Sequence, residues 1–142
     1  LGRALEMEES GFLEKRHEHL LSLSTLYRIP QEEAVEWASR FVKRLGKDER
    51  HGEMGILLSL WKTWYRDLLL LKVKGPEELL INMDLSRELK IGAEAFKISY
   101  LTSSLLALDQ AEKALVRFRN PELILENTVL RLKQNESSGG VS

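Results

Sequence analysis

The sequence predicts an all-α fold, a helical bundle of about five to six helices. Apolar residues recur every three or four positions along most of the chain, which is the spacing of one face of a helix. No stretch alternates cleanly between apolar and polar residues, as a half-buried strand does. The length of 142 residues suits one domain with a single packed core.

Proline and glycine delimit the first two helices. A helix is expected over residues 11–23, and residues 26–30 should break the chain because the residue before Pro30 is steered away from helical angles. Pro30 should then open a second helix at a favoured early position, with acidic residues at the positive end of its dipole. Gly46 should end that helix as a left-handed cap.

A central helix should follow the charged turn of residues 47–53. Gly75 and Pro76 should end it, and a short helical turn is expected over residues 77–80. We assign four residues of the central helix to the core, where a truncation such as Trp64→Ala costs about 3–5 kcal/mol. These core residues are Trp61, Trp64, Tyr65 and Leu68.

Further helices complete the bundle. Asp84 is expected to cap a helix over residues 85–90, and a second long helix should run from about residue 92 to residue 118. Asn120 and Pro121 should cap and start the last helix. The central and last helices are apolar over a wide surface. This pattern fits either an inner helix of the bundle or a face that a neighbouring subunit covers.

The composition excludes several kinds of site. The chain has no cysteine, so it has no disulfide, no thiolate metal site and no cysteine nucleophile, and a cytoplasmic location is expected. Its 21 Lys and Arg residues balance 22 Asp and Glu residues, so we expect no direct binding of nucleic acid. The apolar run of residues 68–71, which no other run exceeds in length, is far shorter than the ~20 residues that span a membrane.

No motif predicts catalysis or a cofactor. His17 and His19 lie two apart and would point to different sides of a helix, whereas a zinc pair usually lies four apart. The serines have no nucleophile-elbow pattern around them, and no Gly-rich phosphate loop precedes a helix. We therefore expect no catalytic residue, no metal and no cofactor, so the fragment should not be an enzyme.

Three segments carry a resemblance to a known family. Residues 64–72, 80–84 and 120–126 resemble, in order and spacing, the carboxy-terminal collar region of the delta-prime subunit of the bacterial DNA polymerase III clamp loader. Residues 1–5 also look like the end of an AAA+ lid, with Gly2 standing where ATP-binding relatives place a sensor arginine. By this resemblance the chain is a piece of a longer clamp-loader subunit.

The resemblance divides the chain into parts. Residues 1–25 would hold the end of the AAA+ lid and a connecting helix, and residues 26–134 would form the helical collar domain. Residues 135–142 include a Ser-Ser-Gly-Gly run and should be a disordered tail.

The resemblance also implies a function in DNA replication. Collar domains of this family hold the clamp-loader subunits together, so the expected partners are delta and the gamma/tau ATPase subunit, with the ATP chemistry outside this fragment. The end of the second long helix mixes aromatic and charged residues, as interfaces do. The interface residues expected there are Tyr100, Arg117, Phe118 and Arg119. The alternative is a helical adaptor or regulatory domain unrelated to replication.

Overall fold

The computed structural model describes residues 2–117 and 119–135, with side chains from residue 11 on, and this described part is all-α. Its α-helices are α1 (Gly2–Arg28), α2 (Gln31–Lys43), α3 (Arg50–Lys72), α4 (Ser86–Ala95), α5 (Ile98–Val116) and α6 (Pro121–Asn135). Two 3₁₀ turns, η1 (Glu77–Leu79) and η2 (Met83–Leu85), lie between α3 and α4. The predicted helical bundle is confirmed. No helix in the described part of the chain combines the length and the apolar run that crossing a bilayer requires.

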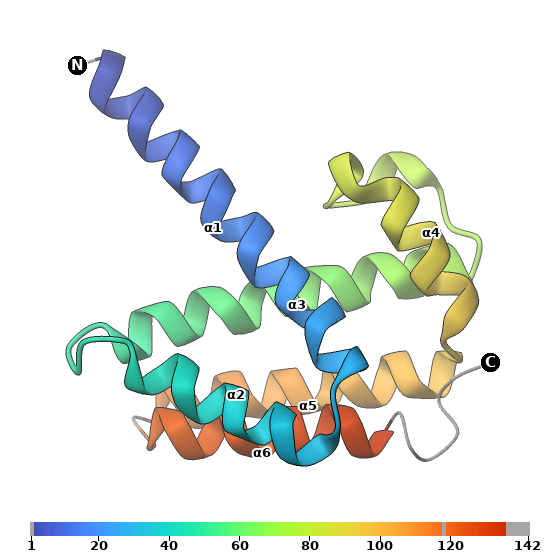
Figure 1. Ribbon diagram of the computed structural model, residues 1–142. Coiled ribbons are helices and arrows are strands. Elements are labelled where there is room, and N and C mark those ends of the chain that lie inside the picture. Colours follow the sequence, from blue (N-terminus) through green and yellow to red (C-terminus); the bar gives the residue numbers. More distant parts are fainter. Residues whose placement is uncertain (1, 118, 136–142) are drawn as a thin grey trace.

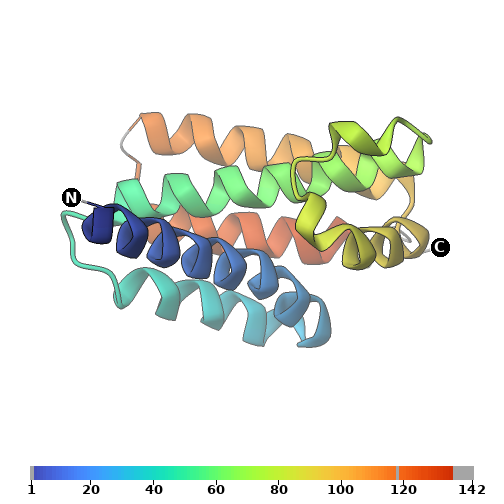
Figure 2. The same ribbon diagram turned by 90° about the horizontal axis from the view of Figure 1, so that it is seen from above.

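Helix α3 is the centre of the bundle. It packs against α1, α4 and α5, while α6 packs against α2 and α5. Figures 1 and 2 show α5 and α6 running side by side, and α1 crossing α3 so that its amino end projects away from the other helices. The chain therefore has a densely packed body and one helix whose first turns extend beyond it.

The buried residues of α3 explain its central place. Trp61, Tyr65 and Leu68 are completely buried, and the Trp61 indole Nε1 donates a hydrogen bond to the carbonyl oxygen of His19 in α1 at 2.9 Å. Trp64 is only partly buried at the edge of the core. The wide apolar surface of α3 is thus covered by the other helices of the same chain, as expected of an inner helix.

A buried carboxylate connects α3 to the segment that follows it. Asp67 is 1% exposed, and its two oxygens accept hydrogen bonds from the backbone N–H groups of Ile81 at 2.9 Å and Asn82 at 2.8 Å. The Asn82 side-chain amide donates a further bond of 2.9 Å to the same carboxylate. These three donors offset the cost of taking a charge out of water. Two of the three segments behind the family resemblance therefore meet at this point.

The same segment also holds α1. The Arg16 guanidinium donates to the Asn82 side-chain oxygen at 2.6 Å and to both carboxylate oxygens of Asp84 at 2.9 Å. This bidentate pairing fixes the direction of the arginine as well as its position. The expectation that Asp84 caps the next helix is wrong, because its carboxylate is turned to Arg16 and α4 begins at Ser86 without a side-chain cap.

The helix ends differ from the expectations in three places. The first helix is longer than expected and continues to Arg28, two residues before Pro30. Helix α2 ends at Lys43, and Gly46 does not adopt the left-handed conformation expected of it. Lys74 instead has a positive φ of 58° after α3, where the N–H of Gly75 reaches the carbonyl of Leu70 at 2.8 Å. This is a Schellman-type ending with lysine at the position that usually carries glycine.

The helix expected over residues 92–118 is in fact two helices. Phe96 is extended, with φ −113° and ψ 147°, and separates the end of α4 from the start of α5. The break turns the Phe96 ring onto Tyr27 and Tyr100, with ring centroids 5.1 and 4.5 Å away. Burial of the aromatic ring thus outweighs continuation of the helix, which periodicity alone does not reveal. By contrast, Asn120 caps α6 as expected, accepting from the N–H of Glu122 at 2.9 Å.

The two tryptophans of α3 should respond differently to truncation. Trp61→Ala removes a fully buried ring and its hydrogen bond, so we expect a loss of about 3–5 kcal/mol in the free energy of unfolding. Trp64→Ala should cost clearly less, below the value expected from the sequence, because its ring is only partly buried. Urea unfolding followed by circular dichroism measures both, and equal losses for the two variants would contradict this placement.

His19 should make the fold less stable in acid. Burial lowers the pKa of His19, and its Nε2 has no hydrogen-bond partner among the described atoms. The unfolded chain therefore binds the proton first, and stability should fall as the pH drops below the unfolded value of about 6.5. Comparing urea unfolding at pH 7.5 and 5.5, His19→Gln should show a smaller acid loss than the wild type. Since His17 and His51 remain in both proteins, an unchanged acid loss would exclude His19 as its source.

Candidate subunit-interaction site

The residues expected at an interface do not form one site. Tyr100 lies in the first turn of α5 and is 2% exposed, with its hydroxyl 3.1 Å from that of Tyr65. Its side chain is therefore part of the core. Arg117 and Arg119 are exposed near the other end of α5, about 25 Å away at 1.5 Å per helical residue. Phe118 lies outside the described residues. Of the three expected residues that the structure describes, the two arginines are exposed to a partner.

A groove between α5 and α6 begins beside Arg119. Its floor on the α5 side is made of alanines, of which Ala107 and Ala111 are buried and Ala114 is partly buried. Small side chains at spacings of four and three leave room along this face of the helix. From α6 the groove is lined by the exposed Leu123, the buried Ile124 and three polar residues, which are Asn127, Thr128 and Arg131.

The α2 helix and the Asn120 cap fix one wall of the groove. Asn120 sets the first turn of α6, and Glu122 in that turn accepts a hydrogen bond from the Ser39 hydroxyl of α2 at 2.7 Å. The Ser39 hydroxyl and the nearby Lys43 lower the pKa of the Glu122 carboxyl. Leu123, the next residue, is held facing outward and is 53% exposed. The groove wall is therefore set by local contacts that need no partner.

The rim of the groove carries positive charge and amides. Arg119 and Arg131 line it, no acidic residue does, and the Arg131 guanidinium donates a hydrogen bond to the Gln110 side-chain oxygen. Arg117 lies apart from this rim, in a shallow hollow on another side of α5 with Asp109 and Glu112. The groove thus combines a small-residue floor, an exposed leucine and a cationic rim.

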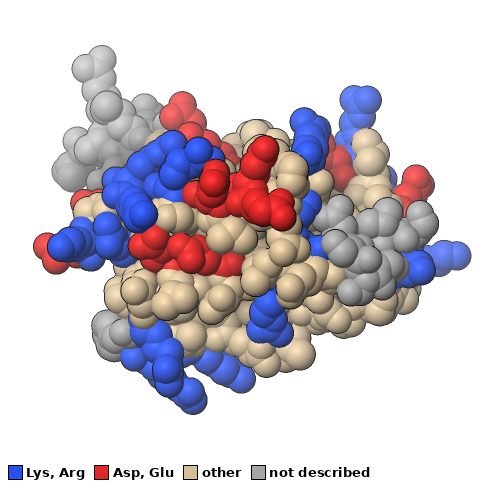
Figure 3. Space-filling model, turned by 60° about the horizontal axis from the view of Figure 1, so that its bottom comes forward, with Lys and Arg blue, Asp and Glu red and all other residues tan. Residues whose placement is uncertain are grey.

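This arrangement suits the packing of a helix and offers no catalytic chemistry. Alanines let another helix approach closely, and helix-in-groove recognition places apolar side chains in such a channel. Among the described side chains, no group of three or more His, Asp or Glu residues is placed to hold a metal ion. On the face shown in Figure 3, Lys and Arg side chains lie in separate small groups with Asp and Glu between them. We therefore interpret the groove as a protein-binding surface.

Sequence reasoning came close to this groove without identifying it. It placed the interface at the end of the long helix, which Arg119 and Asn120 border, but it did not single out the alanine stripe or Leu123. The stripe is visible in the sequence at positions 107, 111 and 114. What the sequence does not show is that α6 lies beside this stripe and leaves Leu123 exposed, while most of its other apolar residues are buried.

Comparison with known families gives one assignment. Residues 10–134 match the family model described as the DNA polymerase III delta subunit, C terminal. The match covers all three segments that carried the resemblance. Comparison with curated proteins and with solved structures gives no match.

Proposed function

The chain belongs to the family of carboxy-terminal domains of the DNA polymerase III delta subunit, and from this premise we propose that it is a collar domain that joins one clamp-loader subunit to its neighbours. The domain is a non-catalytic part of the clamp loader in DNA replication. Its proposed partners are other subunits of that complex, delta and the gamma/tau ATPase subunit. The observation that carries the proposal is the α5–α6 groove, which the described residues line and leave open.

Tethering explains how a domain without chemistry would contribute. A collar fixes several ATPase and clamp-binding modules near one another, so that each module meets its neighbour at a high effective concentration. For this purpose the domain must be rigid and must present a binding surface that its own fold leaves exposed. The buried core residues of α3 and the exposed Leu123 beside an alanine floor fit these two requirements.

We further propose that the parent subunit is delta-prime. The support is the resemblance of residues 64–72, 80–84 and 120–126 to that subunit, and Gly2 in place of a sensor arginine. The matched family model carries the name of the delta subunit, so delta itself is the competing assignment within the clamp loader. An adaptor unrelated to replication loses its support, because the match spans residues 10–134.

The proposed domain division follows from the same assignment. Residues 1–25 would belong to the end of an AAA+ lid and its connecting helix, and residues 26–134 would form the collar within the bacterial cytoplasm. The proposed boundary falls inside α1, so one continuous helix would connect the two parts. Asn135 is the last residue of α6, and the rest of the proposed tail lies outside the described residues.

Assembly with clamp-loader subunits tests the proposed function. The chain, mixed with delta and the gamma/tau subunit of its own organism, should elute as a defined complex in size-exclusion chromatography with light scattering. Leu123→Asp should weaken this association at least about tenfold, or about 1.4 kcal/mol, by placing a charge on the apolar part of the groove. The substitution should leave the fold stable, because an acidic residue is favourable in the first turn of α6.

Ile98→Asp is the matched control. Ile98 is also exposed and lies in the first turn of α5, outside the groove. We expect it to leave the association unchanged. No complex with the folded wild-type chain, or equal weakening by both variants, would contradict a collar that works through the α5–α6 groove.

Competition distinguishes the two parent subunits. Added in excess to an assembled clamp loader, the chain should displace delta-prime if it occupies that position, and the released subunit can be identified by mass spectrometry. Release of delta with delta-prime retained would overturn the finer assignment and leave the collar function intact.

A further inference from the structure

A second unpartnered surface lies on α1, far from the groove between α5 and α6. Leu20, Leu23 and Leu26 make the inner face of this helix and are at most 3% exposed. On the outer side, Leu13 and Leu21 are 57% and 55% exposed. With His17 between them they form a stripe at steps of four residues, one side of a helix. We call Leu13, His17 and Leu21 the α1 stripe.

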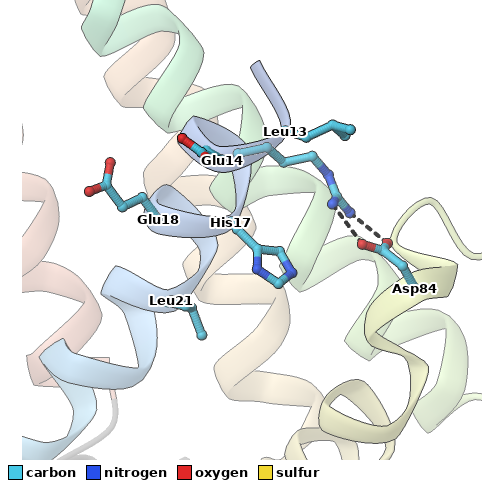
Figure 4. A pocket seen from close by; sticks show the side chains of 7 residues that line it. Leu13, Glu14, His17, Glu18, Leu21 and Asp84 are labelled. Atoms are coloured by element: carbon cyan, nitrogen blue, oxygen red, sulfur yellow. Dashed lines mark hydrogen bonds and ion pairs between the residues drawn. The ribbon is translucent and has the colours of Figure 1, made fainter. Parts of the chain in front are cut away.

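The α1 stripe lines a surface hollow whose two sides differ in charge. Figure 4 shows Glu14 and Glu18 leaving α1 on one side, and His17 pointing to the other side, toward Asp84. Asp84 is the ion-pair partner of Arg16. The Arg16 charge is matched by Asp84, since the guanidinium lowers the pKa of that carboxyl and holds it ionised. Glu14 and Glu18 form no ion pair with any described residue. The hollow is therefore apolar along its length and negative along one edge.

The surface is held in place by the fold. Arg16 anchors α1 to Asn82 and Asp84, and Lys15 forms an ion pair of 2.7 Å with Glu53 of α3. These contacts leave the helix little freedom to turn, so the α1 stripe keeps facing outward. From Leu13 to Leu21 the stripe runs about 12 Å, which matches two to three turns of a docked helix.

We propose that the α1 stripe and the hollow beside it bind an amphipathic helix of another protein that carries leucine-like side chains on one face and Lys or Arg along its edge. Apolar side chains four apart would lie over Leu13 and Leu21. Cations four apart would face Glu14 and Glu18, which share that spacing. The proposal is independent of the α5–α6 groove and adds a second binding surface of opposite charge.

Designed peptides test this occupant. A labelled peptide of about 15–18 residues, with leucines on one helical face and lysines elsewhere, is titrated with the full chain by fluorescence anisotropy. A leucine–glutamate peptide and a leucine–lysine peptide of scrambled order are the probe controls. We expect saturable binding of the first peptide, and at least tenfold weaker binding of the other two.

Variants locate the binding surface. Leu13→Ser/Leu21→Ser and Glu14→Lys/Glu18→Lys should each weaken binding at least tenfold, because all four residues are exposed and line the hollow. Glu36→Lys/Glu94→Lys makes the same change in net charge at exposed positions of α2 and α4, and should change the affinity less than twofold. Circular dichroism of each variant verifies the fold.

Four outcomes would overturn the proposal. The first is that the wild type binds no peptide, and the second is that the glutamate peptide binds as tightly as the lysine peptide. The third is that the control pair Glu36→Lys/Glu94→Lys weakens binding as much as the substitutions in the hollow. The fourth is a dimer in light scattering that Leu13→Ser/Leu21→Ser abolishes, because a second copy of the chain would then be the occupant. None of the four bears on assembly with clamp-loader subunits, so the two proposals fail separately.

Discussion

The buried carboxylate of Asp67 is the constraint around which one end of the bundle is arranged. A charge that is 1% exposed is tolerated only with hydrogen-bond donors in place, and the segment after α3 supplies them from Ile81 and Asn82. Asn82 is then fixed so that its side-chain oxygen accepts from Arg16. One carboxylate of α3 thus sets the path of the η1–η2 segment and, through it, the direction of α1.

The consequence is a rigid body with two different outward surfaces. Helix α3 packs against α1, α4 and α5, and α6 packs against α2 and α5, so the described helices form the buried core among themselves. The α5–α6 groove is rimmed by Arg119 and Arg131, whereas the hollow on α1 is edged by Glu14 and Glu18. Opposite charges on separated surfaces favour distinct partners, because like charges across an interface are costly. For a non-catalytic part of a clamp loader, such surfaces are the means by which it can act.

The sequence predicted the kinds of element better than their ends or their contacts. Periodicity was enough for the all-α class, and Asn120 before Pro121 located the start of α6 through a purely local hydrogen bond. The break at Phe96 was missed because its cause is contact with rings of other helices. No local pattern in the sequence marks Asp67 as a buried carboxylate, and Asp84 has the pattern of a helix cap. Their hydrogen-bond partners lie 14 or more residues away along the chain, so local spacing does not reveal them. Tyr100, which was predicted to lie at an interface, is buried in the fold. An aromatic residue near charges has the same sequence pattern whether it is buried or exposed.

Hydrogen–deuterium exchange of the chain, alone and within a reconstituted clamp loader, tests most directly whether the domain joins subunits through the α5–α6 groove. We expect slower exchange in the complex for the end of α5 and the first turns of α6, with α4 unchanged as the internal reference. Unchanged exchange in α5 and α6, with protection appearing on other helices, would contradict it. The groove would then be an unused surface, and the subunit contacts would lie elsewhere on the bundle.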